Sequence, residues 1–318
     1  MKVLSRLSSE FQYWGTRATI RIIRIMPYHL ALTLGRFIML LVWAFMPLRR
    51  RIVRIQIGSA LGLRNPWRLV LKVFMNQGDI LIDTIKYAYM STEEIRKRVR
   101  VDGMEYLDEA LASNKGVLIF TGHIGNWEVL SHFARLRDFE CCVMADIRKD
   151  PRLESIVDGL RARSGATILP PKGKALMLIK ELRKGRNIAI IVDQRGKRRD
   201  GLFCTVFGLP AVTNPAPAFI AIKGDALVLP VYIVKLGGLH HIRFMKAVDA
   251  ADFGEGSDAI QALSDYMQST LASVVEQYPD QWFWLHSRWV RRENFRKTIR
   301  TIEDFRGFAI SNAKKKAP

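Results

Sequence analysis

From Val101 onward, short apolar runs alternate along the chain with longer segments whose apolar residues recur at helical spacing. Short runs that are rich in branched residues and bounded by glycine or polar residues are typical of buried strands. The runs predict strands at 117–121, 140–145, 166–169, 188–193, 226–234 and 241–247. Helices are predicted between them, near 126–137, 151–163, 173–184, 214–223 and 257–277. This alternation predicts an α/β fold with a largely parallel sheet flanked by helices.

The N-terminal part of the chain has a helical pattern instead. Residues 28–46 lie between two prolines and are almost wholly apolar, and nineteen helical residues rise roughly 28 Å, close to the hydrocarbon thickness of a bilayer. We interpret this segment as a membrane anchor that either spans the bilayer or dips into one leaflet; a buried core helix is the alternative. Arg36, near its middle, would cost about 2.5–3.5 kcal/mol if it faced lipid.

Segments on both sides of the anchor complete the predicted organisation. Before it, Arg17, Arg21 and Arg24 stand among isoleucines in a basic amphipathic stretch. After it, residues 66–90 have the pattern of one or two amphipathic helices, and Ser91–Glu94 is a capping box that begins another. The expected boundaries are an N-terminal basic segment and anchor at 1–55, a domain at 56–305 (helical lead-in 56–100, α/β core 101–290) and a basic tail at 306–318.

Composition limits the classes of partner. Hydrophobic residues make up 49% of the 318 residues, which excludes disorder, and 50 Lys and Arg against 30 acids give a formal charge of +20. Such a charge indicates an anionic partner: nucleic acid, an anionic lipid surface or an acidic protein. Three cysteines, two of them adjacent, give no disulfide framework, so we expect a reducing compartment.

The stretch 116–130 holds the strongest candidate chemistry. After the strand 117–121, glycines punctuate a turn that carries His123, and Asn126 is a good N-cap for the helix in whose first turn Glu128 lies. Chemistry in α/β folds gathers at the carboxyl ends of strands. A first-turn carboxylate stays ionised and is suited to hold an imidazole in one tautomer, leaving its other nitrogen free to take a proton. The alternative is an ordinary loop histidine beside an ordinary first-turn acid.

Three further segments carry polar groups. Arg161, with Arg163 close by, lies on the helix after a strand, where arginine can meet a phosphate or an oxyanion, or can simply be solvated. The strand 188–193 ends in Asp193, Gln194 and Arg195, followed by a basic loop suited to phosphorylated head groups or an acidic carrier protein. Residues 282–289 are rich in tryptophan and include His286 and Arg288, which we expect to serve packing and interfacial contact.

Several classes of site are not supported by the sequence. No His, Cys or acid spacing resembles a zinc site, and the adjacent His240 and His241 point to opposite faces of a strand. Neither a Gly-x-Ser-x-Gly elbow nor a Walker loop is present, which removes serine hydrolases and P-loop enzymes. No known nucleic-acid module is visible, and the basic loop has few interleaved aromatic residues, so we expect no nucleic-acid partner.

From residue 28 to about Arg292 the chain resembles the bacterial lipid A late (secondary) acyltransferase family, within the lysophospholipid-type acyltransferases. The family's mark is a His separated by four residues from Asp or Glu, the HX4E motif, here His123 and Glu128 in Gly-His-Ile-Gly-Asn-Trp-Glu. Supporting stretches are 161–165, 193–194, 206–208 with Thr213, and 285–288. One departure is Gly122, where relatives usually have Asn, and it bears on the acceptor more than on the reaction.

The resemblance implies a glycerolphosphate acyltransferase-like fold on the cytoplasmic face of a bacterial inner membrane. It implies transfer of an acyl chain from acyl carrier protein, or acyl-CoA, to a hydroxyl of a phosphorylated glycolipid, for relatives a lipid A precursor in lipopolysaccharide biosynthesis. His123 would be the general base oriented by Glu128, and Arg161 a catalytic or oxyanion contact. The substrate-binding residues expected on this basis are Gly125, Asn126, Trp127, Arg163, Asp193, Gln194, Arg195, His286 and Arg288.

No metal or redox cofactor is required by this chemistry. The charge of +20 suits an acidic carrier protein, a phosphorylated acceptor and an anionic membrane surface alike. Three alternatives stay open: the same transfer to a lysophospholipid, an ornithine lipid or a mannosylated phosphoinositide; a non-catalytic basic tether; and a lipid hydrolase with the same His and acid.

Overall fold

The computed structural model describes residues 2–137, 139, 141–144, 151–165, 167–169, 175–197 and 199–314. Arg198 of the basic loop, the ends of the predicted strand 140–145, the first residue of 166–169, the start of the helix predicted at 173 and the terminal Lys315 and Lys316 lie outside these residues.

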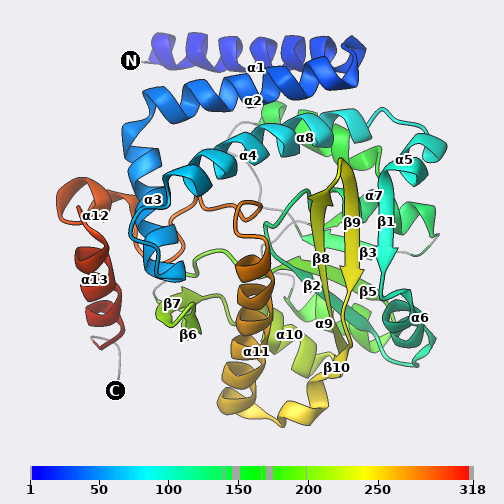
Figure 1. Ribbon diagram of the computed structural model, residues 1–318. Coiled ribbons are helices and arrows are strands. Elements are labelled where there is room, and N and C mark those ends of the chain that lie inside the picture. Colours follow the sequence, from blue (N-terminus) through cyan, green and yellow to red (C-terminus); the bar gives the residue numbers. More distant parts are fainter. Residues whose placement is uncertain are drawn as a thin grey trace.

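A mixed eight-stranded sheet forms the centre of the molecule, in the order β1-β9-β8-β2-β5-β3-β4, with β10 paired to β8 (Figure 1). Its strands are β1 (Val99–Asp102), β2 (Val117–Thr121), β3 (Cys141–Met144), β4 (Thr167–Leu169), β5 (Asn187–Ile191), β8 (Leu227–Leu236), β9 (Leu239–Phe244) and β10 (Val248–Asp249). All pairs are parallel except β8 with β9 and with β10. The predicted α/β class with a largely parallel sheet is therefore confirmed.

Helices cover both faces of this sheet, and β2 shows why. Its alternate residues Leu118 and Phe120 pack with one set of helices, whereas Val117 and Ile119 pack with the other. The first set is α9 (Ala175–Arg183), α10 (Ala216–Lys223) and α11 (Gly256–Gln277). The second is α5 (Thr92–Arg98), α6 (Met104–Ala112) and α7 (Val129–Leu136), while α8 (Pro151–Ala162) lies near the N-terminal helices. A strand buried on both faces reads as a continuous apolar run, which is why its position was predictable.

The sequence did not predict the short elements. The hairpin of β6 (Leu202–Val206) and β7 (Leu209–Thr213) was missed, since no strand was predicted between residue 193 and the helix expected from 214. Its turn has left-handed backbone at Phe207 and Gly208, with φ of 51° and 69°. The edge strand β1 and the two-residue β10 were missed as well, since neither has an apolar run of its own.

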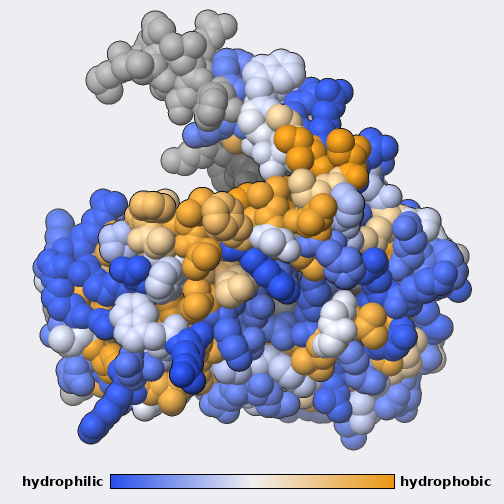
Figure 2. All heavy atoms as spheres, turned by 45° about the horizontal axis from the view of Figure 1, so that its top comes forward, coloured by the Kyte–Doolittle hydropathy of each residue, from blue (hydrophilic) through white to orange (hydrophobic). Residues whose placement is uncertain are grey.

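The N-terminal helices form a layer above the sheet in Figure 1: α1 (Lys2–Ile25), α2 (Tyr28–Phe45), α3 (Pro47–Leu61) and α4 (Trp67–Tyr87). One face of α2 packs on α4, where Arg36 forms an ion pair with Asp79 at 2.7 Å, although the Arg36 side chain stays 47% exposed. The other face is exposed at Leu30, Phe37 and Phe45. Figure 2 shows apolar residues gathered in a band across this side of the molecule. Among the described helices, α2 alone has the length and hydropathy to cross a membrane, and it lies near the N-terminus.

Two glycines let α2 approach α4 closely. A Cβ atom on Gly78 would lie 2.5 Å from the carbonyl oxygen of Gly35, which is backbone and cannot move aside. We therefore expect Gly78→Ala to push the helices apart and to lower the free energy of unfolding by about 1–3 kcal/mol. Chemical unfolding checks this, with Gly15→Ala on α1 as control, because a Cβ there meets nothing within 4 Å. Equal stability of Gly78→Ala and the parent would contradict the prediction.

The C-terminal part ends in α12 (Arg292–Lys297) and α13 (Ile302–Lys314). Residues beyond 305 were expected to form a basic tail, whereas the structure has helix as far as Lys314. Phe305 and Ala309 lie one helical turn apart and are buried against the core, and Arg306 donates a hydrogen bond to the carbonyl of Ser59 on α3.

Candidate active site

His123 and Asp193 meet because of the register of two parallel strands. Thr121 at the end of β2 pairs with Ile191 at the end of β5, so the residues two positions later emerge next to each other. Asp193 Oδ1 lies 2.7 Å from His123 Nδ1, and Asp193 Oδ2 accepts the backbone N–H of His123 at 2.7 Å. Trp282 Nε1 donates a further hydrogen bond of 2.7 Å to Oδ2. Three groups therefore fix this buried carboxylate at the carboxyl edge of the sheet.

The hydrogen bonds define the state of the imidazole. Because a carboxylate only accepts, neutral His123 donates its Nδ1–H to Asp193 and leaves Nε2 with a lone pair. The side-chain amide of Gln194 lies 3.2 Å from Nε2 and donates to it. The sequence expectation that Glu128 orients this ring is corrected: the carboxylate on Nδ1 is Asp193, which was expected only to help shape the site. Spacing along the chain favoured Glu128, whereas the β2–β5 register brings in Asp193.

Electrostatics reinforce this pair. Burial alone lowers the pKa of His123, but the charge and hydrogen bond of Asp193 outweigh it and hold that pKa above its ordinary value. Burial alone raises the pKa of Asp193, yet His123 and Trp282 hold it well below its usual range. Asp193 is thus ionised, and the imidazole is a stronger base than a free histidine.

Glu128 binds Arg161 instead. Their closest atoms, Arg161 Nη2 and Glu128 Oε1, are 2.8 Å apart, and Arg161 Nε lies 3.2 Å from both carboxylate oxygens. Burial lowers the pKa of Arg161, and Glu128 more than offsets this, so the pKa of Arg161 lies above its ordinary value and the guanidinium is charged. Both groups act electrostatically on His123, Glu128 raising and Arg161 lowering its pKa. The pair therefore links α8 to the loop that carries His123. In the described part of the chain, Arg161 Nη1 forms no hydrogen bond.

The loop 123–126 is clamped by residues 281–283. Gly125 N–H donates to the carbonyl of Gln281, and Phe283 N–H donates to the carbonyl of His123, both at 2.9 Å. The ring of Trp127 packs edge-on against His123, with centroids 4.5 Å apart. Asn126 Oδ1 accepts the N–H of Glu128 and closes a turn, so α7 begins at Val129 rather than at 127. The aromatic segment is therefore part of the site, and the expected interfacial role of its tryptophans is wrong, because Trp282, Trp284 and Trp289 are buried.

Two glycines are required by close contacts in this loop. Gly125 has φ of +53°, and a Cβ there would lie 2.0 Å from the carbonyl oxygen of Ile233. At Gly122 a Cβ would lie 2.9 Å from Asp193 Oδ2. The departure from the family's usual Asn at this position thus leaves room for the carboxylate that holds His123.

The other predicted site residues have different surroundings. Arg163 is exposed, and Arg195 is half-buried, with its pKa lowered by burial and by Arg291. Burial also lowers the pKa of His286 to about 4, and its Nδ1 donates to the carbonyl of Phe283. Arg288 does not fit the expected contact with substrate. It is 0% exposed, and its guanidinium binds Val212, Thr213 and Gln268, so it ties β7 to α11.

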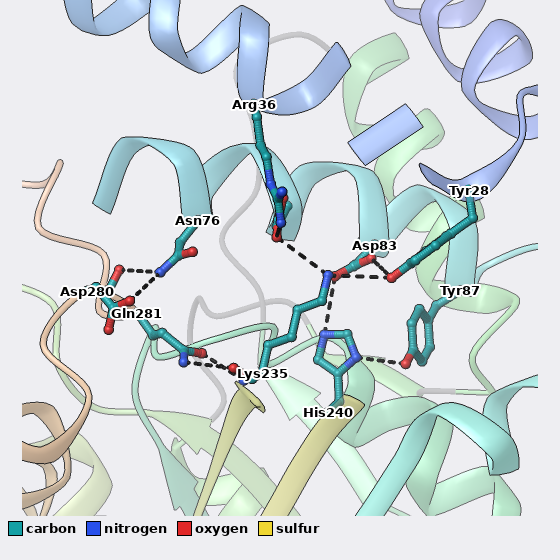
Figure 3. A network of polar contacts seen from close by, with 10 residues as sticks. Tyr28, Arg36, Asn76, Asp83, Tyr87, Lys235, His240, Asp280 and Gln281 are labelled. Carbon is teal, nitrogen blue, oxygen red and sulfur yellow. Dashed lines mark hydrogen bonds and ion pairs between the residues drawn. The ribbon is translucent and has the colours of Figure 1, made fainter. Parts of the chain in front are cut away.

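A second polar network lies beneath α2 and α4 (Figure 3). Its centre is Asp83 of α4, 1% exposed, which accepts from Tyr28 Oη at 2.6 Å and from Lys235 Nζ at 2.8 Å. His240 Nε2 lies 3.3 Å from the same carboxylate, and its Nδ1 lies 2.7 Å from Tyr87 Oη. No pattern along the chain indicates these contacts, because they join α2 and α4 to β8 and β9 over long separations.

Relatives of known activity share much of this chain. A phosphatidylinositol mannoside acyltransferase of Mycobacterium tuberculosis is 24% identical over 193 residues, 60% of this chain and 60% of that protein. This chain thus matches only about three fifths of that relative's length. A lipid A biosynthesis palmitoleoyltransferase of Escherichia coli strain K12 is 22% identical over 300 residues, 90% of this chain and 95% of the relative. A phosphatidylinositol mannoside acyltransferase of Mycolicibacterium smegmatis is 23% identical over 205 residues, 63% of this chain and 66% of that relative.

The model of one protein family, described as bacterial lipid A biosynthesis acyltransferase, matches residues 2–291. This range contains the clamped loop, the His123–Asp193 pair and the Glu128–Arg161 pair. By this match over nearly its whole length, the chain belongs to the bacterial lipid A biosynthesis acyltransferase family.

Proposed function

We propose that this protein transfers a fatty acyl chain from a thioester donor to a hydroxyl group of a membrane lipid, with His123 as general base. The observation that carries the proposal is the imidazole of His123, fixed by Asp193 on one side and presenting an unprotonated Nε2 on the other. An alcohol is a weak nucleophile, and a positioned base that removes its proton supplies about 10²–10⁴-fold in rate.

The reaction follows from this geometry. The acceptor hydroxyl takes the place of the Gln194 amide at Nε2, gives its proton to the imidazole and attacks the thioester carbonyl. Asp193 stabilises the imidazolium that forms, as its depressed pKa requires. The tetrahedral intermediate then collapses, the C–S bond breaks, and the imidazolium returns the proton to the leaving thiolate. Arg161, held by Glu128, is our candidate for stabilising the oxyanion.

The donor and acceptor are proposed by chemistry. We propose acyl carrier protein as donor, because it is strongly acidic and this chain has a formal charge of +20; acyl-CoA, which is also anionic, is the alternative. For the acceptor, we favour a lipid A precursor, because the relative that matches over 90% of this chain is a lipid A biosynthesis enzyme. Phosphatidylinositol mannosides are the second candidate, since relatives acting on them match over 60% and 63% of the chain.

We further propose that the protein works at the cytoplasmic face of the bacterial inner membrane. Support comes from α2, which keeps one apolar face exposed while the other is bonded to α4 through Arg36 and Asp79. A helix that packs on the protein along one face and is apolar along the other is better suited to lie in the membrane interface than to cross the bilayer by itself.

The purified protein with a panel of donors and acceptors tests this function. Acyl carrier protein and CoA thioesters are each combined with a lipid A precursor, a phosphatidylinositol mannoside or a lysophospholipid, and products are identified by mass spectrometry. An acylated lipid formed only with acceptor present supports the proposal. Release of free fatty acid at the same rate without acceptor would establish a hydrolase instead, and no thioester consumption with any pair would favour the non-catalytic basic tether.

A further inference from the structure

A cavity of about 310 Å³ lies between α1 and α8. Three arginines of α1 line it, together with Arg163, which directly follows α8: Arg17, Arg21, Arg24 and Arg163. None of the described residues that line it is acidic. The rest of the lining includes the polar residues Tyr89 and Ser155 and the apolar residues Ile156 and Leu160.

Two of the four arginines, Arg24 and Arg163, are held in place without being neutralised. The guanidinium carbons of Arg24 and Arg163 lie 4.7 Å and 4.6 Å from the centroid of the same ring, Tyr89. Within the described ranges, none of the four lining arginines forms an ion pair with a carboxylate. Nearer the start of α1, Glu10 pairs with Arg152 of α8 at 2.5 Å. This ion pair joins the two helices at one point. At the cavity the helices bring several positive charges together, and a bound anion would reduce the repulsion between them.

The surroundings of the cavity indicate what kind of anion fits. A guanidinium presents a planar fork of donors that matches phosphate oxygens in a bidentate way. On the same helix, Ile22 and Ile25 are 50% and 83% exposed, and the apolar face of α2 begins at Leu30. A ligand that satisfies both features carries a phosphate at one end and hydrocarbon chains at the other.

We propose that this cavity binds the phosphate ester of a lipid head group. The phosphate would belong either to the acceptor itself or to a phospholipid of the surrounding membrane. The first source rests on the proposed function, and it is geometrically reasonable because Arg163 stands two residues after Arg161, which is bonded to the catalytic loop through Glu128. A phosphate held there would keep the acceptor beside that loop.

Calorimetric titration of the full-length protein with short-chain phosphatidic acid tests the binding site, with short-chain phosphatidylcholine as the zwitterionic comparison. Each arginine near an anionic lipid contributes about 1 kcal/mol, so Arg21→Gln with Arg163→Gln is expected to bind phosphatidic acid about thirty-fold more weakly. Arg64→Gln with Arg68→Gln is the matched control. Both residues are exposed and lie outside the cavity, and the two substitutions remove the same amount of charge. Replacing Arg21 and Arg163 by Lys keeps the charge and should restore part of the affinity.

Two results would overturn the proposal: equal binding of phosphatidic acid and phosphatidylcholine by the parent protein, or unchanged affinity in Arg21→Gln with Arg163→Gln. A second measurement separates the sources of phosphate. The KM of Arg21→Gln with Arg163→Gln is measured in neutral micelles. A raised KM for a phosphorylated acceptor, with the KM for the dephosphorylated acceptor unchanged, assigns the site to the acceptor. Weaker binding to phosphatidylglycerol vesicles with both KM values unchanged assigns it to membrane phospholipid. The titration involves no turnover, so it remains decisive if no acyl transfer is found.

Discussion

Replacing His123 by alanine is expected to lower kcat by about 10²–10⁴-fold while the protein stays folded. The substitution removes the imidazole that is placed to take the acceptor's proton at the edge of β2 and β5, where its ring lies against Trp127 and Phe283. Steady-state acyl transfer and thermal unfolding measure the two effects separately. His241→Ala is the matched control, since His241 stands on β9, away from the catalytic loop. A His123→Ala variant with the parent's kcat would remove the imidazole from the mechanism.

The partner of the imidazole is tested by the pH dependence. The base works in its neutral form, and Asp193 raises the pKa of His123, so kcat/KM should fall on the acid side with a midpoint above 6.5. Asp193→Asn removes the negative charge, lowers the pKa of His123 and should move that midpoint to lower pH. It should also reduce kcat on the order of 10²-fold, because an amide whose oxygen keeps the bonds from His123 N–H and Trp282 Nε1 turns its NH2 group toward Nδ1 and so favours the tautomer protonated at Nε2.

Glu128→Gln separates the two possible carboxylates. If Asp193 is the orienting group, Glu128→Gln lowers kcat through its effect on Arg161 and leaves the acid midpoint closer to that of the parent. A larger shift of the midpoint in Glu128→Gln than in Asp193→Asn would return the orienting role to Glu128.

Removing the carboxylate of Asp83 is expected to destabilise the fold by about 3–5 kcal/mol, the usual consequence of breaking a buried charge pair. Asp83→Ala leaves Lys235, Tyr28 and His240 without their common acceptor beneath α4. Urea unfolding checks this, and Asp225→Ala is the control, because the side chain of Asp225 is 64% exposed and its ion pair with Lys115 should contribute under about 1 kcal/mol. If both variants lost the same free energy of unfolding, the buried network would stabilise the fold no more than an exposed ion pair does.

The pH dependence of this stability has a defined sign. Burial raises the pKa of Asp83, but His240 and Lys235 together hold it below its ordinary value of 3.8. Its contribution is therefore complete above 3.8 and is lost as the pH falls through the lower pKa of the folded state. The parent should lose stability more steeply than Asp83→Asn in that acid range.

Local patterns were enough to predict the longer strands and helices, but they predicted neither the short strands nor which strands pair. Apolar runs such as 117–121 identify strands because burial on both faces leaves no polar position, and Ser91 caps α5 as its motif indicates. The partner of His123 depended on which strand lies next to β2 and in what register, and neither is written in the spacing of residues. Arg288 was misjudged for a related reason. Its environment is set by Gln268 and Thr213, far away along the chain.

The contact between α2 and α4 has a consequence for any shortened form of the protein. A chain that began after residue 46 would lose Arg36 and Tyr28 together, so Asp79 would keep only its longer ion pair with Lys235 among its described partners, and Asp83 would lose the hydrogen bond from Tyr28. It would also expose Gly78 of α4, against which Gly35 of α2 packs. The helix that we propose as membrane anchor is thus also part of the folded structure, and a detergent-free form of the protein is better sought by making the outward side of α2 polar than by deleting it.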